Sequence, residues 1–184
     1  LSKIMERVLG KKRLPMLIID KKPILNNRSA FNAKVAAIYG FSLFGRDYCY
    51  LLDKDNEIDY KSLNNFLKKF KGEKFFIFGF TSLIFENLIK KLSTRLLFSN
   101  FTNGILLHGG GWKKLEKLKI NNYQFKKKLS GKLKINNIYN YYGLVEQTGS
   151  IFLECKFLNI SRVSKVNKRN TCTFSTVNCP GHIP

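Results

Sequence analysis

Acidic residues are scarce in this chain. Its 184 residues contain 12 Asp and Glu against 33 Lys and Arg, which gives a formal net charge of +21. Such an excess indicates either a polyanionic partner, nucleic acid or an anionic membrane surface, or a lysine-rich composition with its charges on solvated helix faces. The aromatic residues lie in apolar runs such as residues 75–78 and form no nucleic-acid motif, so the sequence favours the second interpretation.

Long apolar segments are absent as well. The most apolar run, residues 74–85, is interrupted by Gly79 and Thr81, so we expect no membrane span. No charged-then-apolar leader with a small-residue cleavage site is visible, and we expect a cytoplasmic protein. The first residue is Leu1 and not Met, from which we expect the sequence to begin inside a longer protein.

The few cysteines do not have the spacing of a metal site. Cys49, Cys155, Cys172 and Cys179 include no C-x-x-C pair, and the one histidine near the last two is His182. This spacing argues against zinc, and we interpret the four as reduced cytosolic thiols.

Apolar runs and helical periodicities alternate along the chain, in which hydrophobic residues make up 44%. Ser29 and Asp59 are expected to cap two helices, and Gly10, Gly40 and Gly72 to end three. Strands that alternate with helices predict right-handed crossovers, so the expected fold class is α/β with a mainly parallel sheet and flanking helices. We expect strands at residues 14–19, 48–52, 74–80, 104–107, 135–141 and 151–155, and helices at 2–9, 29–39, 60–70, 81–97, 112–118 and 123–129.

The chain changes character after Cys155. Residues 156–184 contain no acidic residue and show no clear periodicity. We therefore divide the chain into a partial α/β domain, residues 1–155, and an irregular tail, residues 156–184. The tail is interpreted as a truncated or frame-shifted end, with a floppy terminus as the alternative.

Ligands of parallel sheets bind beyond the carboxyl ends of the strands, which makes three turns candidate sites. Thr81 and Ser82 offer hydroxyls and backbone N–H groups to an anion or a carboxylate, or they simply start and cap a helix. His108 precedes three glycines, residues 109–111, that let a flat ligand approach the backbone or form a plain tight turn. The glycine run matches neither the Walker loop nor the G-x-G-x-x-G pattern.

The third turn, residues 142–150, combines an aromatic side chain with hard oxygen ligands. Tyr142 followed by Gly143 presents a ring beside open backbone, which suits stacking on a purine. Glu146 could bind Mg²⁺ at a polyphosphate, and Thr148 could hydrogen-bond a phosphate or a reacting carboxylate. The alternative is a hairpin turn bounded by glycines, with an exposed glutamate.

Three runs, residues 78–86, 107–116 and 142–152, together resemble the acyl-protein synthetase (LuxE-like) family of the adenylate-forming, AMP-binding enzymes. Residues 28–31 and 40–45 are similar to that family too, and the resemblance covers residues 13–155. It implies part of the large N-terminal domain of such an enzyme. It also implies that a carboxylate, from a fatty acid, attacks the α-phosphate of ATP to give an acyl-adenylate and pyrophosphate. The acyl group then moves to a cysteine of the synthetase and on to a thiol of a partner reductase.

The resemblance assigns roles to residues of all three turns. Glu146 and Thr148 are the expected catalytic residues, and Glu146 is also the expected Mg²⁺ ligand. Nucleotide binding, with Tyr142 stacked on adenine, is implied for Gly109, Gly110, Gly111, Tyr142, Gly143 and Glu146. Binding of the acid is implied for Phe80, Thr81 and His108.

The sequence also departs from the family pattern. The Ser/Thr/Gly-rich phosphate loop should precede residue 1, and the C-terminal lid with its lysine and the acyl-accepting cysteine should follow the chain. We therefore expect an incomplete enzyme with little or no activity. Two alternatives stay open: a noncatalytic remnant of such an enzyme, and a basic protein that binds nucleic acid or anionic lipid.

Overall fold

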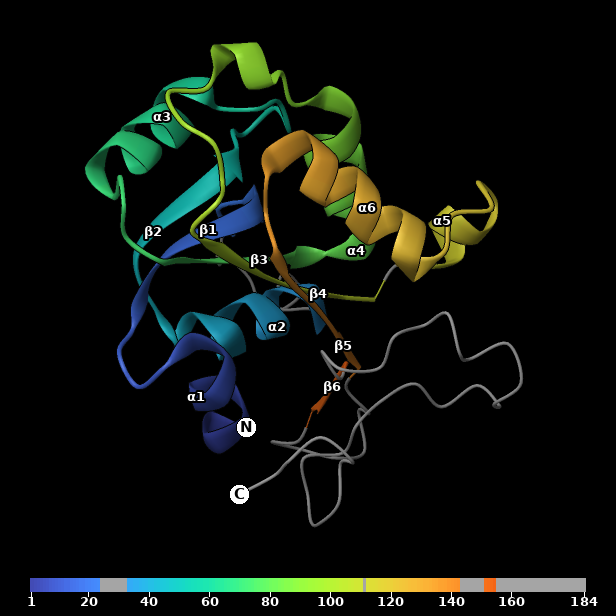
Figure 1. Ribbon diagram of the computed structural model, residues 1–184, viewed down its shortest axis with the longest axis horizontal. Helices are drawn as coiled ribbons and strands as arrows, with labels where there is room; N and C mark the ends of the chain where they lie inside the picture. Colours follow the sequence, from blue (N-terminus) through green and yellow to red (C-terminus); the bar gives the residue numbers. More distant parts are fainter. Residues whose placement is uncertain (24–32, 111, 143–150, 155–184) are drawn as a thin grey trace.

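The computed structural model describes residues 1–23, 33–110, 112–142 and 151–154, and these form one six-stranded sheet with helices on both faces (Figure 1). Strands β1 to β5 are parallel, and β6 pairs antiparallel with β5. The predicted α/β class with a mainly parallel sheet is therefore confirmed. The strands, in their order across the sheet, are β2 (Gly45–Leu52), β1 (Leu14–Lys21), β3 (Phe75–Phe80), β4 (Gly104–Gly109), β5 (Asn137–Tyr142) and β6 (Phe152–Leu153).

The helices divide between the two faces of the sheet. Figure 1 shows α1 and α2 on one face and α3, α4 and α6 on the other. No helix among the described residues is long and apolar enough to cross a membrane. The bounds are α1 (Ser2–Leu9), α2 (Ala33–Ser42), α3 (Tyr60–Lys69), α4 (Thr81–Ile84) with its continuation as a π-helix η2 (Phe85–Lys91), the 3₁₀ turn η3 (Thr94–Leu96), α5 (Lys113–Glu116) and α6 (Asn122–Leu133).

Alternate residues of the central strands fill two separate cores. On β1, Leu17 and Ile19 pack with α3, η2 and α6, while Met16 and Ile18 pack with α1 and α2. All four side chains are fully buried. A strand that is covered on both faces needs a continuous apolar run and not an alternating one, which is what the sequence of β1 provides.

Helix α3 follows its sequence signals closely. The Asp59 carboxylate accepts a hydrogen bond from the backbone N–H of Ser62 at 2.9 Å, so the predicted cap is confirmed. Hydrogen bonds from Ser62 also lower the pKa of Asp59. Leu63, Phe66 and Leu67 recur at helical spacing and are buried against the sheet.

Two wrongly predicted helix ends have identifiable contacts behind them, and a third, that of α6, lies at Leu133 and not at residue 129. Helix α2 continues through Gly40 to Ser42, because Phe41 packs against Phe78 with ring centroids 4.6 Å apart. Such a contact outweighs the roughly 1 kcal/mol that an internal glycine costs a helix. The start expected at Ser29 lies outside the described residues.

The other wrong end is that of the helix expected to reach residue 97. Here the buried Asn87 side chain donates a hydrogen bond to the Leu83 carbonyl at 2.9 Å, competing with the regular backbone pattern. The helix widens into η2 and closes with a bond from Leu92 N–H to the Asn87 carbonyl at 2.8 Å. The regular helix therefore stops at Lys91, and after Leu92 and Ser93 the chain forms the 3₁₀ turn η3.

Candidate functional site

The carboxyl ends of β3, β4 and β5 meet at one edge of the sheet. Phe80 lies opposite Gly109, and His108 lies opposite Asn140. This register gathers the predicted residues Phe80, Thr81, His108, Gly109, Gly110 and Tyr142 at that edge. The other predicted site residues lie outside the described residues: Gly111, Gly143, Glu146 and Thr148.

Thr81 and His108 form a buried pair across the ends of β3 and β4. Both side chains are fully buried, and Thr81 Oγ1 lies 3.0 Å from His108 Nδ1. The residue that precedes α4 is Phe80, whose side chain cannot accept a hydrogen bond. The interpretation of Thr81 as a helix cap is therefore wrong, because its hydroxyl is used to orient the imidazole.

His108 is held neutral by its surroundings. Its ring packs against Phe125, with centroids 4.7 Å apart, and against Trp112 at 5.9 Å. Burial, with a smaller contribution from Lys126, lowers the pKa of His108 to about 3. The imidazole is thus uncharged at neutral pH, and its Nε2 atom has no hydrogen-bond partner among the described residues.

Gly109, the last residue of β4, and Gly110, which follows it, are favoured for two different reasons. A Cβ atom on Gly109 would lie 2.5 Å from the Tyr141 carbonyl oxygen and 2.7 Å from its ring. Gly110 has a φ of +64°, which disfavours other residues. Tyr141 thus fills the space beside Gly109 that we expected a flat ligand to use. The role of these glycines in nucleotide binding stays a prediction.

A hollow of about 430 Å³ opens beside the end of β5, between the α5 segment and the start of α6. Asn122 and Asn140 are among the residues that line it, and the Oδ1 atoms of both are buried below its surface without a hydrogen-bond partner in the described part of the chain. Buried acceptors without a hydrogen-bond donor cost free energy and are uncommon in folded proteins. The lining residues are Trp112, Glu116, Lys119, Ile120, Asn121, Asn122 and Asn140.

Sequence reasoning missed Asn122 and Asn140. Asn140 lies two residues after the buried Ile138 on the same face of β5. A polar residue on the same face as the buried Ile138 was the available signal. Asn122 carried no comparable signal, because it is the first residue of a helix that begins with two asparagines.

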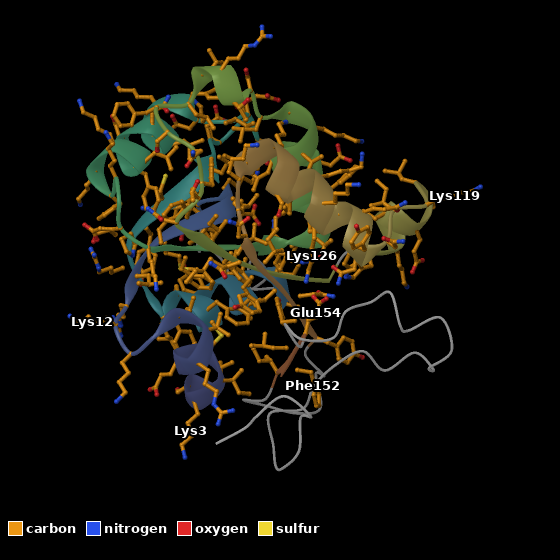
Figure 2. All side chains as sticks on the ribbon, in the orientation of Figure 1. Lys3, Lys12, Lys119, Lys126, Phe152 and Glu154 are labelled. Atoms are coloured by element: carbon orange, nitrogen blue, oxygen red, sulfur yellow. The ribbon has the colours of Figure 1, made fainter. Side chains whose placement is uncertain are left out.

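Glu154 connects these asparagines to α6. Its carboxylate forms an ion pair with Lys126, with Nζ and Oε2 2.6 Å apart, and accepts a hydrogen bond from Asn122 Nδ2 at 2.9 Å. Its backbone N–H donates to the Asn140 carbonyl at 2.9 Å. Figure 2 shows the Lys126 and Glu154 side chains approaching each other between α6 and the end of β6.

Comparison with known proteins identifies the family of the chain. The family model of LuxE, the acyl-protein synthetase, matches residues 1–178. The chain belongs to the acyl-protein synthetase family. No match to a curated protein was found. The match includes residues 156–178, which we assigned to an irregular tail, and the division at residue 155 stays a prediction.

An acyl-protein synthetase passes its acyl group to a protein, so the thiols matter. Cys49 is buried in the core, and burial, followed by the nearby Asp59 charge, raises its pKa to about 12. Such a thiol is not a nucleophile at neutral pH. The other three cysteines, Cys155, Cys172 and Cys179, lie outside the described residues.

The expected metal ligand lies outside the described residues. The described residues contain no group of three or more His, Cys, Asp or Glu that could hold a metal, and Glu146, the expected Mg²⁺ ligand, is not among them.

A second hollow, of about 610 Å³, flanks α6 and shares Lys119 with the first. Lys119, Lys127 and Lys128 line it and form no ion pair with any described residue.

Proposed function

We propose that this chain carries the nucleotide- and acid-binding edge of an ATP-dependent acyl-protein synthetase. In this function a carboxylic acid, from a fatty acid, is activated as an acyl-adenylate and then transferred to a protein thiol. The observation that carries the proposal is the hollow at the end of β5, which Trp112 and Asn140 line beside the strand ends that hold Phe80, His108 and Gly109.

An adenine ring has the chemistry that this hollow lacks. Its exocyclic amino group is a donor that would satisfy the Asn140 carboxamide oxygen once that side chain turns toward the hollow, and one such hydrogen bond is worth about 1–3 kcal/mol. Trp112 supplies an apolar wall, and Tyr142, 55% exposed at the end of β5, is the proposed stacking partner of the adenine ring. Lys119 adds positive charge for a polyphosphate.

The proposed reaction has two displacements. A carboxylate oxygen attacks the α-phosphorus, the bond from that phosphorus to the bridging oxygen breaks, and pyrophosphate leaves. A thiolate then attacks the acyl carbon and AMP leaves with the electron pair. Bound Mg²⁺ would neutralise the polyphosphate, with Glu146 as its proposed ligand. Thr148 is proposed near the α-phosphate, and Phe80, Thr81 and His108 beside the acid.

The buried Thr81–His108 pair suits an uncharged role. A histidine with a pKa of about 3 neither carries positive charge nor accepts a proton efficiently at neutral pH. His108 would therefore shape and orient the acid site and not act as a general base. This distinguishes it from the catalytic residues proposed in the turn after β5.

The single tryptophan of the chain makes ATP binding measurable. Because Trp112 lines the hollow, Mg·ATP should change its fluorescence saturably, and Asn140→Ala should weaken binding about tenfold, as for loss of one hydrogen bond to a buried acceptor. Asn100→Ala, at an exposed loop position, is the matched control. Absence of any saturable change in the parent chain would overturn the proposal.

Pyrophosphate exchange with fatty acids separates the catalytic function from its noncatalytic alternative. Exchange above the level of a Glu146→Ala variant supports the synthetase. Saturable ATP binding without exchange supports the remnant that binds nucleotide and does not turn over.

A further inference from the structure

The second hollow combines lysines with apolar side chains. Its other wall is the turn 118–120, in which Leu118 is 49% exposed. None of the described residues that line this hollow is acidic. Five of the lining residues recur at helical spacing and form one stripe along α6: Gln124, Lys127, Lys128, Gly131 and Lys132.

The fold uses only one of the four lysines of this hollow. Lys132 donates a hydrogen bond to the Ile89 carbonyl of η2 at 2.5 Å. Lys119, Lys127 and Lys128 are exposed and form no ion pair with a described residue. Like charges gathered on one helix face repel each other and do not stabilise the helix. The three lysines are therefore available to an anion from outside the chain.

Gly131 is not required by the fold at its place in the stripe. It lies inside α6, where glycine is less favourable than alanine. It is not among the glycines with a positive φ, and a Cβ atom on it would meet nothing within 4 Å. What a glycine does here is leave the hollow open, so that another chain can approach α6 closely.

The composition of the hollow indicates which kind of anion fits. Nucleic-acid sites rely on arginine and on aromatic rings that stack on bases, and the described lining residues include neither. A helix that lies on a membrane presents its apolar face to the lipid. In α6 that face, with Phe125, Leu129 and Leu133, is buried in the core. Lysines beside Leu118 and Ile120 instead complement a protein segment that carries both carboxylates and apolar side chains.

We propose that this hollow is the docking site for an acidic segment of a partner protein, whose carboxylates pair with Lys119, Lys127 and Lys128. The stripe on α6 runs for about 12 Å at 1.5 Å per residue, which matches about two turns of a bound helix. The two hollows share Lys119 and Ile120, so the bound segment would lie beside the first hollow. The docking site goes beyond the proposed function and holds whether or not ATP binds.

A labelled peptide tests the charge of the site. The probe has about 15 residues, enough to span the stripe, with glutamates on both sides of leucines at every fourth position. Its fluorescence anisotropy on titration with the full chain at low salt gives the dissociation constant. Lys127→Glu combined with Lys128→Glu should weaken binding about tenfold or more, because two attractions become repulsions.

The control makes the same change in net charge at a distant place. Lys11 and Lys12 lie exposed after α1, and Figure 2 shows Lys12 and Lys119 at opposite sides of the molecule. Lys11→Glu combined with Lys12→Glu should weaken peptide binding less than about threefold, because salt screens distant charges.

A second pair of variants tests the shape of the site at constant charge. Gly131→Met should weaken peptide binding about tenfold by filling the hollow, while α6 gains helix propensity and stays folded. Gly40→Met, in α2, is the control, since a Cβ atom there also meets nothing within 4 Å. It should leave peptide binding unchanged.

Three results would overturn the docking site. The first is no saturable binding of the peptide to the parent chain. The second is equal binding loss in the two double lysine variants, or none in the Lys127 and Lys128 variant and in Gly131→Met. The third comes from titrations with a single-stranded oligonucleotide and with phosphatidylglycerol vesicles. If either binds the parent more tightly than the peptide does and loses binding in the Lys127 and Lys128 variant, the hollow is a nucleic-acid or lipid site.

Discussion

Strands β1 and β3 and the edge formed by β4 and β5 bury polar groups in different ways. Among the described residues of β1 and β3 the buried carboxylate is Asp20. Its Oδ1 atom accepts hydrogen bonds from the Lys21 N–H and from Lys34, and its Oδ2 atom has no hydrogen bond but lies 2.8 Å from the Lys34 ammonium, which neutralises its charge. At the β4–β5 edge, His108, Asn122 and Asn140 each bury a polar atom that has no partner among those residues. The first region is built for stability, and the second keeps hydrogen-bonding capacity in reserve.

The difference shows where binding free energy is available. An unpaired buried acceptor costs about 1–3 kcal/mol in the absence of a ligand. A ligand with matching donors removes that cost when it binds, whereas a ligand at a satisfied surface gains no such term. Under the proposed function, the β4–β5 edge is where a bound nucleotide would gain this term.

The largest expected effect lies in the satisfied region. Phe76 is fully buried between α1, α2 and the sheet, and Phe76→Ala should lower the free energy of unfolding by about 3–5 kcal/mol, because it leaves a cavity. Denaturant titration measures this loss. Phe98→Ala, at a half-exposed ring, should change stability by less than about 1 kcal/mol, and comparable losses in both would contradict the described core.

The next effect is a pH dependence from His108. Its folded pKa of about 3 lies below the ordinary 6.5, so the unfolded chain binds a proton that the folded chain excludes. The contribution of His108 to the free energy of unfolding is therefore highest above pH 6.5. It falls as the pH drops toward 3, by at most about 1.4 kcal/mol per pH unit. His108→Gln should remove this component from unfolding measured at pH 7, 6 and 5. Identical pH slopes in parent and variant would show that His108 titrates normally.

Several elements were predictable because their signals are local. The apolar runs of β1, β3 and β4, and the Asp59 cap with its helical spacing in α3, need no information from elsewhere in the chain. The ends of α2 and η2 could not be predicted, because they depend on distant or unusual contacts. Phe41 on Phe78 and the Asn87 side chain on the Leu83 carbonyl are such contacts.

The meeting of the strand ends was predictable, whereas the contacts among their side chains were not, and the roles of the site residues stay predictions. Glycine and aromatic patterns identified the strand ends, and parallel register brings them together. The partners of Asn140 and Glu154 could not be deduced, because they join α6, β5 and β6. The use of the Thr81 hydroxyl by His108, 27 residues away, was hidden for the same reason.

A smaller effect is expected where a satisfied polar group is removed. Asp59→Ala deletes the acceptor for the Ser62 N–H at the start of α3 and should destabilise the fold by about 1 kcal/mol. Thermal unfolding at neutral pH measures it, with Asp55→Ala in the exposed turn before α3 as the control. A neutral result would show that packing of Leu63 and Phe66 alone holds the helix.

The smallest effect on stability, and the one that most sharpens the comparison, is Asn140→Leu. Leucine has nearly the shape of asparagine without its unpaired oxygen, so the ligand-free chain should be unchanged or more stable by up to about 1 kcal/mol. ATP binding, followed by Trp112 fluorescence, should weaken at least tenfold in the same variant. Stability and binding would then move in opposite directions at Asn140, while Asp59→Ala lowers stability and leaves binding intact. A loss of stability at Asn140 as large as that at Asp59 would mean that its oxygen is satisfied in the folded chain, and that the two regions do not differ in the way described.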